Sequence, residues 1–203
     1  MNSKTAIKQL EELKKQTPKK LRLAAEKWKY PWKTLISTIL SARTRDETTI
    51  KVSLELYKKY PTIKQLSNAS IESIQKTIKP INFYKNKSKN ILNYSNELIK
   101  NHKGIPSHDF NKLINLPGVG RKTANVFLSE IGYNTIGVDT HVSYISQKLE
   151  WTNNKNPIKI ESDLKNLFPK KYWKNINPIL VRFGKTYISK KKDEILDNIK
   201  KIK

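Results

Sequence analysis

The sequence has no cysteine, few acidic residues and no long apolar run. Without a thiol the chain cannot form a disulfide, a thiolate metal site or a cysteine nucleophile. Its first residues, MNSKTAIKQLEELKKQ, have no continuous apolar core like that of a secretory signal, and no other stretch is apolar over the length that spans a bilayer. These absences predict a soluble, cytoplasmic protein without a membrane partner.

Positive charge dominates the composition. The 203 residues include 41 Lys and Arg against 17 Asp and Glu, for a formal net charge of +24. A field of this sign attracts polyanions, so nucleic acid is the first partner expected and an anionic membrane surface the second. However, only five of the basic residues are Arg, and the chain is rich in Asn and Ile. A compositional bias that leaves lysines solvated, with no polyanion bound, therefore remains an alternative.

Apolar residues recur with helical spacing along most of the chain. Such stripes begin at Trp32, Ile71, Ile176 and Ile195, whereas the alternation typical of strands is rare and never sustained. The pattern predicts an all-α protein with ten or more helices. No low-complexity linker divides the chain, and the segments 101–109 and 152–157 are predicted to be loops between helices.

The stretch LPGVGRKTANVF, Leu116–Phe127, predicts a helical hairpin. A short helix that contains Phe110 and Leu113 leads into the turn, and the stripe that starts at Ala124 marks the second helix. Pro117 stiffens the turn, while Gly118 and Gly120 allow positive φ and the close approach of a ligand. Backbone amides at the head of a helix form an anion site, and in so basic a chain the expected anion is a nucleic-acid phosphate.

Two cations, Arg121 and Lys122, stand in the first turn of this second helix. Lys122 lies nearly opposite the apolar stripe, so it is predicted to project outward beside the phosphate site. The positive end of the helix dipole and the neighbouring Arg121 both disfavour its ammonium form and are expected to lower its pKa. A neutral amine is a nucleophile suited to Schiff-base chemistry. The alternative is that both residues bind phosphate and do no chemistry.

The stretch TIGVDTHV, Thr135–Val142, places Asp139 at the start of another apolar stripe. Its simplest predicted role is the N-cap of that helix. Asp139 and His141 also carry side chains that bind metals, but two such residues without a third make a poor site. We therefore expect no metal.

Together these two stretches resemble the helix-hairpin-helix signature of DNA glycosylases, specifically the endonuclease III family. The similarity runs from about Trp28 to about Tyr187. It implies a bifunctional DNA glycosylase and AP lyase of base excision repair, which flips an oxidised pyrimidine out of the duplex. Lys122 occupies the position of the family's catalytic lysine, which attacks the sugar and allows strand cleavage by β-elimination. Asp139 occupies that of the catalytic carboxylate, which deprotonates the lysine or stabilises oxocarbenium charge.

The resemblance also implies an architecture of two helical lobes flanking a DNA-binding cleft. A six-helix lobe would span residues 28–134, with the hairpin at about 109–132. Residues 1–27 and 135–203 would form the second lobe, which carries Asp139. The expected partner is double-stranded DNA that contains damaged bases or abasic sites, bound by a monomer. The residues expected to contact DNA are Leu116, Gly118, Val119, Gly120, Arg121, Arg43, Phe83 and His141.

The chain departs from the family at three places. Arg43 stands where the best-known relatives carry a glutamine, and it would either fill the gap left by the flipped nucleotide or contact phosphate. Phe83 stands at the position of a leucine wedge, and it would either unstack bases or pack in the core. Most of the family ends in four cysteines around an iron–sulfur cluster. Here a lysine-rich tail replaces them, so we expect no cofactor and a terminal helix docked by its apolar stripe.

Two other functions remain open from the sequence. An oxidised-purine glycosylase with AP lyase activity would keep the hairpin lysine. A non-catalytic helix-hairpin-helix protein would bind DNA but would need neither Lys122 nor Asp139. The presence of both residues favours an enzyme.

Overall fold

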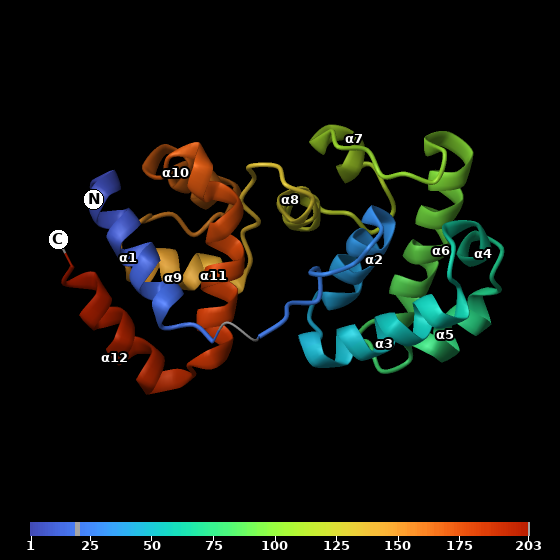
Figure 1. The fold of residues 1–203 in the computed structure, drawn as a ribbon, viewed down its shortest axis with the longest axis horizontal. Helices are drawn as coiled ribbons and strands as arrows, with labels where there is room; N and C mark the ends of the chain where they lie inside the picture. The colour runs from blue at the N-terminus through green and yellow to red at the C-terminus, as the bar shows by residue number, and fades with distance from the viewer. Residues whose placement is uncertain (19–20, 203) are drawn as a thin grey trace. The chain divides into compact units, whose positions relative to one another are not determined.

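The computed structural model of the chain is helical, as the apolar periodicity predicts. It describes residues 1–18 and 21–202, and this part contains twelve α-helices, one 3₁₀-helix and no strand (Figure 1). The helices belong to two compact units, one made of residues 22–131 and the other of residues 1–21 and 132–203. Among the described helices, none combines the length and the apolar character needed to cross a membrane.

Helix α2 (Pro31–Ser41) organises the unit of residues 22–131. It packs against α3, α6 and α8, and its side chains are buried on nearly every face. A helix that is buried on all sides carries mostly apolar or small side chains, and α2 does so. Its buried Ser37 has a hydrogen-bond partner inside the core, the Tyr57 hydroxyl at 2.8 Å. The other helices of this unit are α3 (Asp46–Lys59), α4 (Ile63–Ser67), α5 (Ile71–Ile78), α6 (Tyr84–His102), α7 (Phe110–Ile114) and α8 (Arg121–Glu130).

Side-chain caps define several of the helix starts in this unit. Ser70 accepts a hydrogen bond from the Ser73 amide over 3.2 Å, which confirms the start predicted for α5. Asp109 accepts bonds from the amides of Asn111 and Lys112 and so starts α7. Each cap satisfies N–H groups that have no carbonyl partner within the helix.

The second unit has its own core around α11 (Trp173–Thr186), which packs against α1 and α9. Gly184 lies within this helix and marks a close approach: a Cβ there would come within 2.2 Å of Nδ1 of His141 on α9. Only glycine leaves room for that imidazole. The other helices of this unit are α1 (Ser3–Lys15), α9 (Thr140–Lys148), α10 (Pro157–Leu167), the 3₁₀-helix η1 (Lys170–Tyr172) and α12 (Ser189–Lys200).

The terminal helix α12 docks on this second core, which confirms the prediction for the tail. Leu196 and Ile199 are buried, and α12 contacts α1 and α9. Polar contacts fix the position of α12 along α9. The Tyr144 hydroxyl donates to Asp193, Lys148 pairs with Asp197 at 2.9 Å, and Lys200 pairs with Glu150 at 2.7 Å. Of the tail lysines that the sequence predicts to stay in solvent, Lys190, Lys191, Lys200 and Lys201 are exposed, Lys192 is half-buried, and Lys203 lies outside the described residues.

Truncation tests the docking of α12. Deleting residues 190–203 should lower the melting temperature, because Leu196 and Ile199 no longer cover the core. Leu196→Ala alone should lower the free energy of unfolding by about 3 kcal/mol, which lowers the melting temperature of a chain of this size by several degrees. Lys201→Ala is the matched control on the exposed face and should change stability by less than about 0.5 kcal/mol. Thermal unfolding followed by circular dichroism measures all three. A truncated chain that melts with the full-length one would contradict the docking.

Candidate active site

The hairpin turn joins α7 to α8 and is anchored by two side chains in the core of its unit. The side chains of Leu116 and Val119 are only 5% exposed each and lie in the core of this unit. The Val119 amide donates to the Leu116 carbonyl over 3.1 Å, which closes the turn. Both residues were expected to contact DNA. With their side chains in the core, any contact they make runs through their backbone.

The two glycines of the turn serve different purposes. Gly118 has φ +79°, and a Cβ there would lie 2.9 Å from Cβ of Asn90 on α6, so both backbone conformation and space require glycine. Gly120 has an ordinary φ of −91°, and a Cβ there would meet nothing within 4 Å. Gly118 therefore shapes the hairpin, whereas Gly120 leaves open space beside the start of α8.

Helix α8 begins without a side-chain cap. Gly120 is its N-cap, and the first helical bond runs from the Ala124 amide to the Gly120 carbonyl over 2.9 Å. The amides before Ala124 have no helical carbonyl to bind and form the positive end of the helix. Lys122 lies in this first turn and is half-buried, while Arg121 is exposed and places its guanidinium 4.9 Å from the centre of the Phe110 ring. An uncapped helix start next to two cations suits an anion such as phosphate.

Arg43 and Phe83 lie together in the same unit. The Arg43 guanidinium is 5.4 Å from the centre of the Phe83 ring, and both side chains are exposed. Phe83 is 58% exposed, which excludes the core-packing role that the sequence left open. Each residue has a left-handed backbone, with φ of 57° at Arg43 and 60° at Phe83. Such conformations are uncommon for residues other than glycine and persist only where the surroundings hold them.

Sequence reasoning missed Lys87, which stands four residues after Phe83 on α6. It is 7% exposed, and burial, followed by the positive charge of Lys122, lowers its pKa to about 8. Nothing in the sequence marked this residue, because lysines recur throughout the chain and buried ones are rare.

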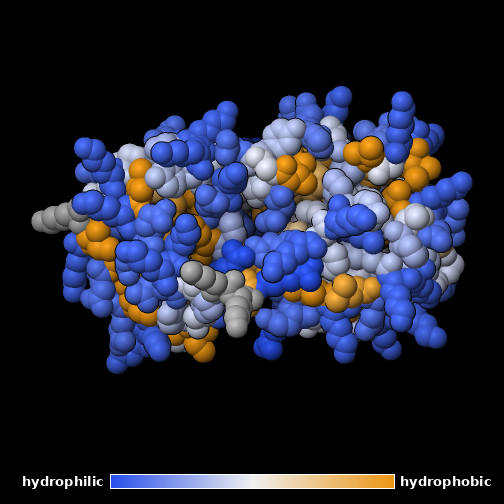
Figure 2. All heavy atoms as spheres, in the orientation of Figure 1, coloured by the Kyte–Doolittle hydropathy of each residue, from blue (hydrophilic) through white to orange (hydrophobic). Residues whose placement is uncertain are grey.

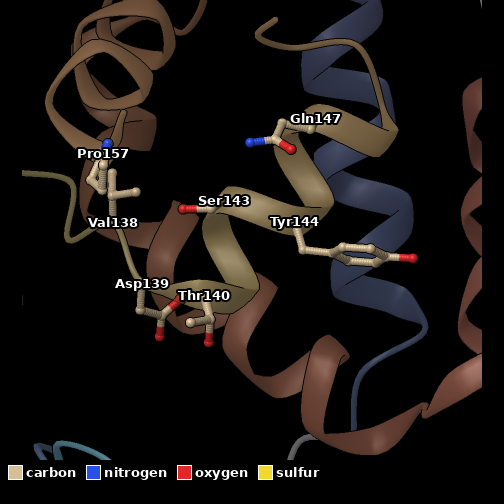
Figure 3. Close-up of a pocket in the computed structure, with 7 residues that line it drawn as sticks. All are labelled: Val138, Asp139, Thr140, Ser143, Tyr144, Gln147 and Pro157. Carbon is tan, nitrogen blue, oxygen red and sulfur yellow. The ribbon is translucent and has the colours of Figure 1, made fainter. Parts of the chain in front are cut away.

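Asp139 and His141 lie in the other unit, at the start of α9. Oδ1 of Asp139 accepts a hydrogen bond from the Val142 amide over 2.9 Å, which confirms Asp139 as the N-cap of this helix. Asp139 is half-buried and lies at one end of a pocket of about 460 Å³. Figure 3 shows Ser143 and Gln147 projecting from later turns of α9 along this pocket. Its lining residues are Val138, Asp139, Thr140, Ser143, Tyr144, Gln147 and Pro157.

The donor groups give no basis for a metal or an iron–sulfur cluster. The chain has no cysteine. Across residues 1–18 and 21–202, His, Asp and Glu form no group of three that could hold a metal ion. The residues present therefore do not fit a cysteine-bound iron–sulfur cluster.

Hydrophilic residues cover most of the face seen in Figure 2, on both units. The apolar surface is broken into small areas between them. The net charge of +24 gives a general attraction for polyanions, and the specific chemistry must come from the residues described above.

Comparison with known proteins agrees with this geometry. The family described as "HhH-GPD superfamily base excision DNA repair protein" matches residues 36–170. Endonuclease III of Thermotoga maritima is 40% identical over 157 residues, which cover 76% of this chain and 73% of the relative. Endonuclease III of Synechocystis sp. is 35% identical over 164 residues, which cover 80% and 75% of the two chains.

A structural relative extends the match to nearly the whole fold. A solved structure of a trapped endonuclease III–DNA covalent intermediate superposes with a TM-score of 0.85 at 30% identity and covers 94% of this chain and 90% of its own. The chain therefore belongs to the HhH-GPD superfamily of base excision DNA repair proteins and, within it, to the endonuclease III family.

Proposed function

We propose that Lys122 and Asp139 carry out the glycosylase and AP lyase chemistry of this base excision repair enzyme. The substrate is double-stranded DNA that contains an oxidised pyrimidine or an abasic site. The observation that carries the proposal is the position of Lys122, in the first turn of a helix that no side chain caps. The covalent DNA intermediate of a related endonuclease III supports a nucleophile in this fold.

In the first step, the neutral amine of Lys122 forms a bond to C1′ of the damaged nucleotide, and the bond from C1′ to the base breaks. The base leaves with the electron pair of that bond and is protonated. Positive charge develops on the sugar ring as the base departs, and the Asp139 carboxylate stabilises this charge or accepts the proton of the lysine ammonium. Asp139 is half-buried and is one of the residues that line the pocket at the start of α9.

In the second step, the amine–sugar adduct opens to an imine between Lys122 and C1′. The imine makes the C2′ proton acidic. Loss of the C2′ proton expels the 3′ phosphate by β-elimination, which cuts the strand 3′ to the lesion. Water then hydrolyses the imine and releases the lysine. The hairpin amides bind a backbone phosphate and hold the duplex in place without reading its sequence.

Arg43 and Phe83 act where the nucleotide leaves the duplex. Phe83 is exposed and can enter the base stack, while Arg43 fills the gap or bonds a guanine edge. Both the glycosylase and the lyase work without an iron–sulfur cluster, because no residue of the chain can bind iron as cysteine does. The protein acts as a monomer.

Replacing the nucleophile tests the first step. Lys122→Gln should reduce cleavage of an oxidised-pyrimidine duplex by on the order of 10³-fold or more, because no other group forms the imine. Sodium borohydride should trap the wild-type protein on this DNA and should not trap the variant. Lys100→Gln, an exposed lysine on α6, is the control for loss of one charge. An adduct that persists in Lys122→Gln would refute the assignment.

Two substitutions separate the roles of Asp139. Asparagine is also a good N-cap, so Asp139→Asn should keep the melting temperature while slowing base removal by about 10²-fold. Asp139→Ala loses the cap as well and should cost about 1 kcal/mol of stability in addition. Single-turnover excision and thermal unfolding measure the two effects. If Asp139→Asn excised bases at the wild-type rate, the residue would be a cap alone.

The two hairpin glycines predict different outcomes for the same substitution. Gly118→Val should destabilise the protein, since valine is strained at φ +79° and would collide with Asn90. Gly120→Val should fold normally yet weaken DNA binding by about 10-fold, because its side chain fills the open space beside the α8 amides. Fluorescence anisotropy with several duplex sequences checks this. A loss of affinity confined to some sequences would contradict a phosphate contact.

A further inference from the structure

Lys87 caps the carboxyl end of α2 from a different helix. Its ammonium donates to the Leu40 carbonyl over 2.7 Å and to the Ala42 carbonyl over 2.6 Å. Leu40 lies in the last turn of α2, and Ala42 is its C-cap residue. Carbonyls at a helix end lack amide partners and carry the negative end of the dipole, so a cation suits them. The end of α2 is thus fixed by a side chain that projects from α6.

The segment that follows this cap is tied to the start of α6. The side-chain amide of Asn82 donates to the Arg43 carbonyl, and its backbone N–H donates to Oγ1 of Thr44 over 3.2 Å. These bonds span 38 and 39 positions of sequence and join the loop after α2 to the residue just before Phe83. The contact of the Arg43 guanidinium with the Phe83 ring, 5.4 Å from its centre, extends the same junction to the surface.

We propose that Lys87 is a positioning residue for DNA recognition: by capping α2 it fixes the loop that carries Arg43 and, through Asn82, the turn that carries Phe83. The two exposed side chains then meet the duplex as one preassembled element. This inference rests on the proposed function, in which Arg43 and Phe83 act where the nucleotide leaves the stack.

The geometry explains why a buried lysine is used here. An ammonium taken out of water is destabilised, and the lowered pKa of Lys87, about 8, reflects that burial together with the charge of Lys122. A methionine of similar length would fill the same space without a charge but would donate to neither carbonyl. The two donated bonds hold Ala42 in place, and the next residue, Arg43, has a left-handed backbone that needs such support.

The experiment compares two substrates that differ in whether a base must be extruded. One duplex carries an oxidised pyrimidine and the other a preformed abasic site, each with 2-aminopurine beside the lesion as a fluorescent reporter of unstacking. The full-length variants are Lys87→Met, Lys87→Arg and Asn82→Ala. The control is Lys100→Met, which removes one exposed charge from the same helix.

Lys87→Met and Asn82→Ala should slow excision of the oxidised base by on the order of 10-fold to 10²-fold, since small misplacements of recognition groups have large effects. Both should also reduce the 2-aminopurine signal. Cleavage of the abasic site should change much less, because no base has to leave the stack. Lys87→Arg keeps the donors and should restore part of the excision rate. These effects would not follow from a general loss of stability, which would affect both substrates equally.

Three results would overturn the inference. The first is excision by Lys87→Met at the rate of Lys100→Met. The second is an equal loss on both duplexes, which would indicate a merely structural lysine. The third is normal excision by Asn82→Ala, which lies on an exposed loop and still decides the question if Lys87→Met fails to fold. A wild-type protein that processes neither duplex would instead contradict the proposed function itself.

Discussion

The uncapped start of α8 is the constraint on which the candidate site depends. A helix that begins at glycine leaves its first amides without a side-chain partner, and Arg121 and Lys122 stand in this first turn, where the dipole disfavours cations. Natural helices usually place acidic or capping residues there. Among the described helices, α1, α4, α5, α7, α9 and α10 begin at a capping side chain, whereas α2, α3, α6, α8, α11 and α12 begin without one. The unfavourable field suits both the binding of a phosphate and the loss of a proton from an amine.

The surrounding structure holds this unfavourable arrangement in place. Leu116 and Val119 fix the turn to the core, and Gly118 allows it to pass close to Asn90. In the same unit, Lys87 lies at the opposite, negative end of a helix dipole, where it donates to carbonyls at the end of α2. Two lysines of one unit therefore interact with opposite ends of two helices, and one of them is buried enough for its pKa to fall to about 8.

Much of the fold could be predicted from the sequence because helical stripes record burial directly. The stripes at Trp32, Ile71, Ile176 and Ile195 correspond to α2, α5, α11 and α12, and the terminal helix docks as its apolar face indicates. The hairpin was recognisable because Pro and Gly at fixed spacing have few other uses. The resemblance to the endonuclease III family came from the same short stretches, and the family match bears it out.

The parts that could not be predicted depend on contacts between distant segments. Lys87 looks like any other lysine until α2 and α6 are packed together. Gly184 looks like the end of a stripe, whereas it makes room for His141. Phe83 could have belonged to the core, and only the folded loop shows it exposed. In each case the identity of the residue is known from the sequence, but its neighbours depend on how distant segments pack together.

The proposed chemistry requires that one amine, that of Lys122, bonds covalently to DNA. Peptide mapping of the borohydride-trapped complex by tandem mass spectrometry tests it most directly, because it finds the modified residue without any substitution. After the DNA is digested, a deoxyribose-derived mass should appear on the peptide that contains Lys122 and on no other. A modification on Lys87, on the terminal lysines or on the N-terminal amine, with Lys122 unmodified, would contradict it.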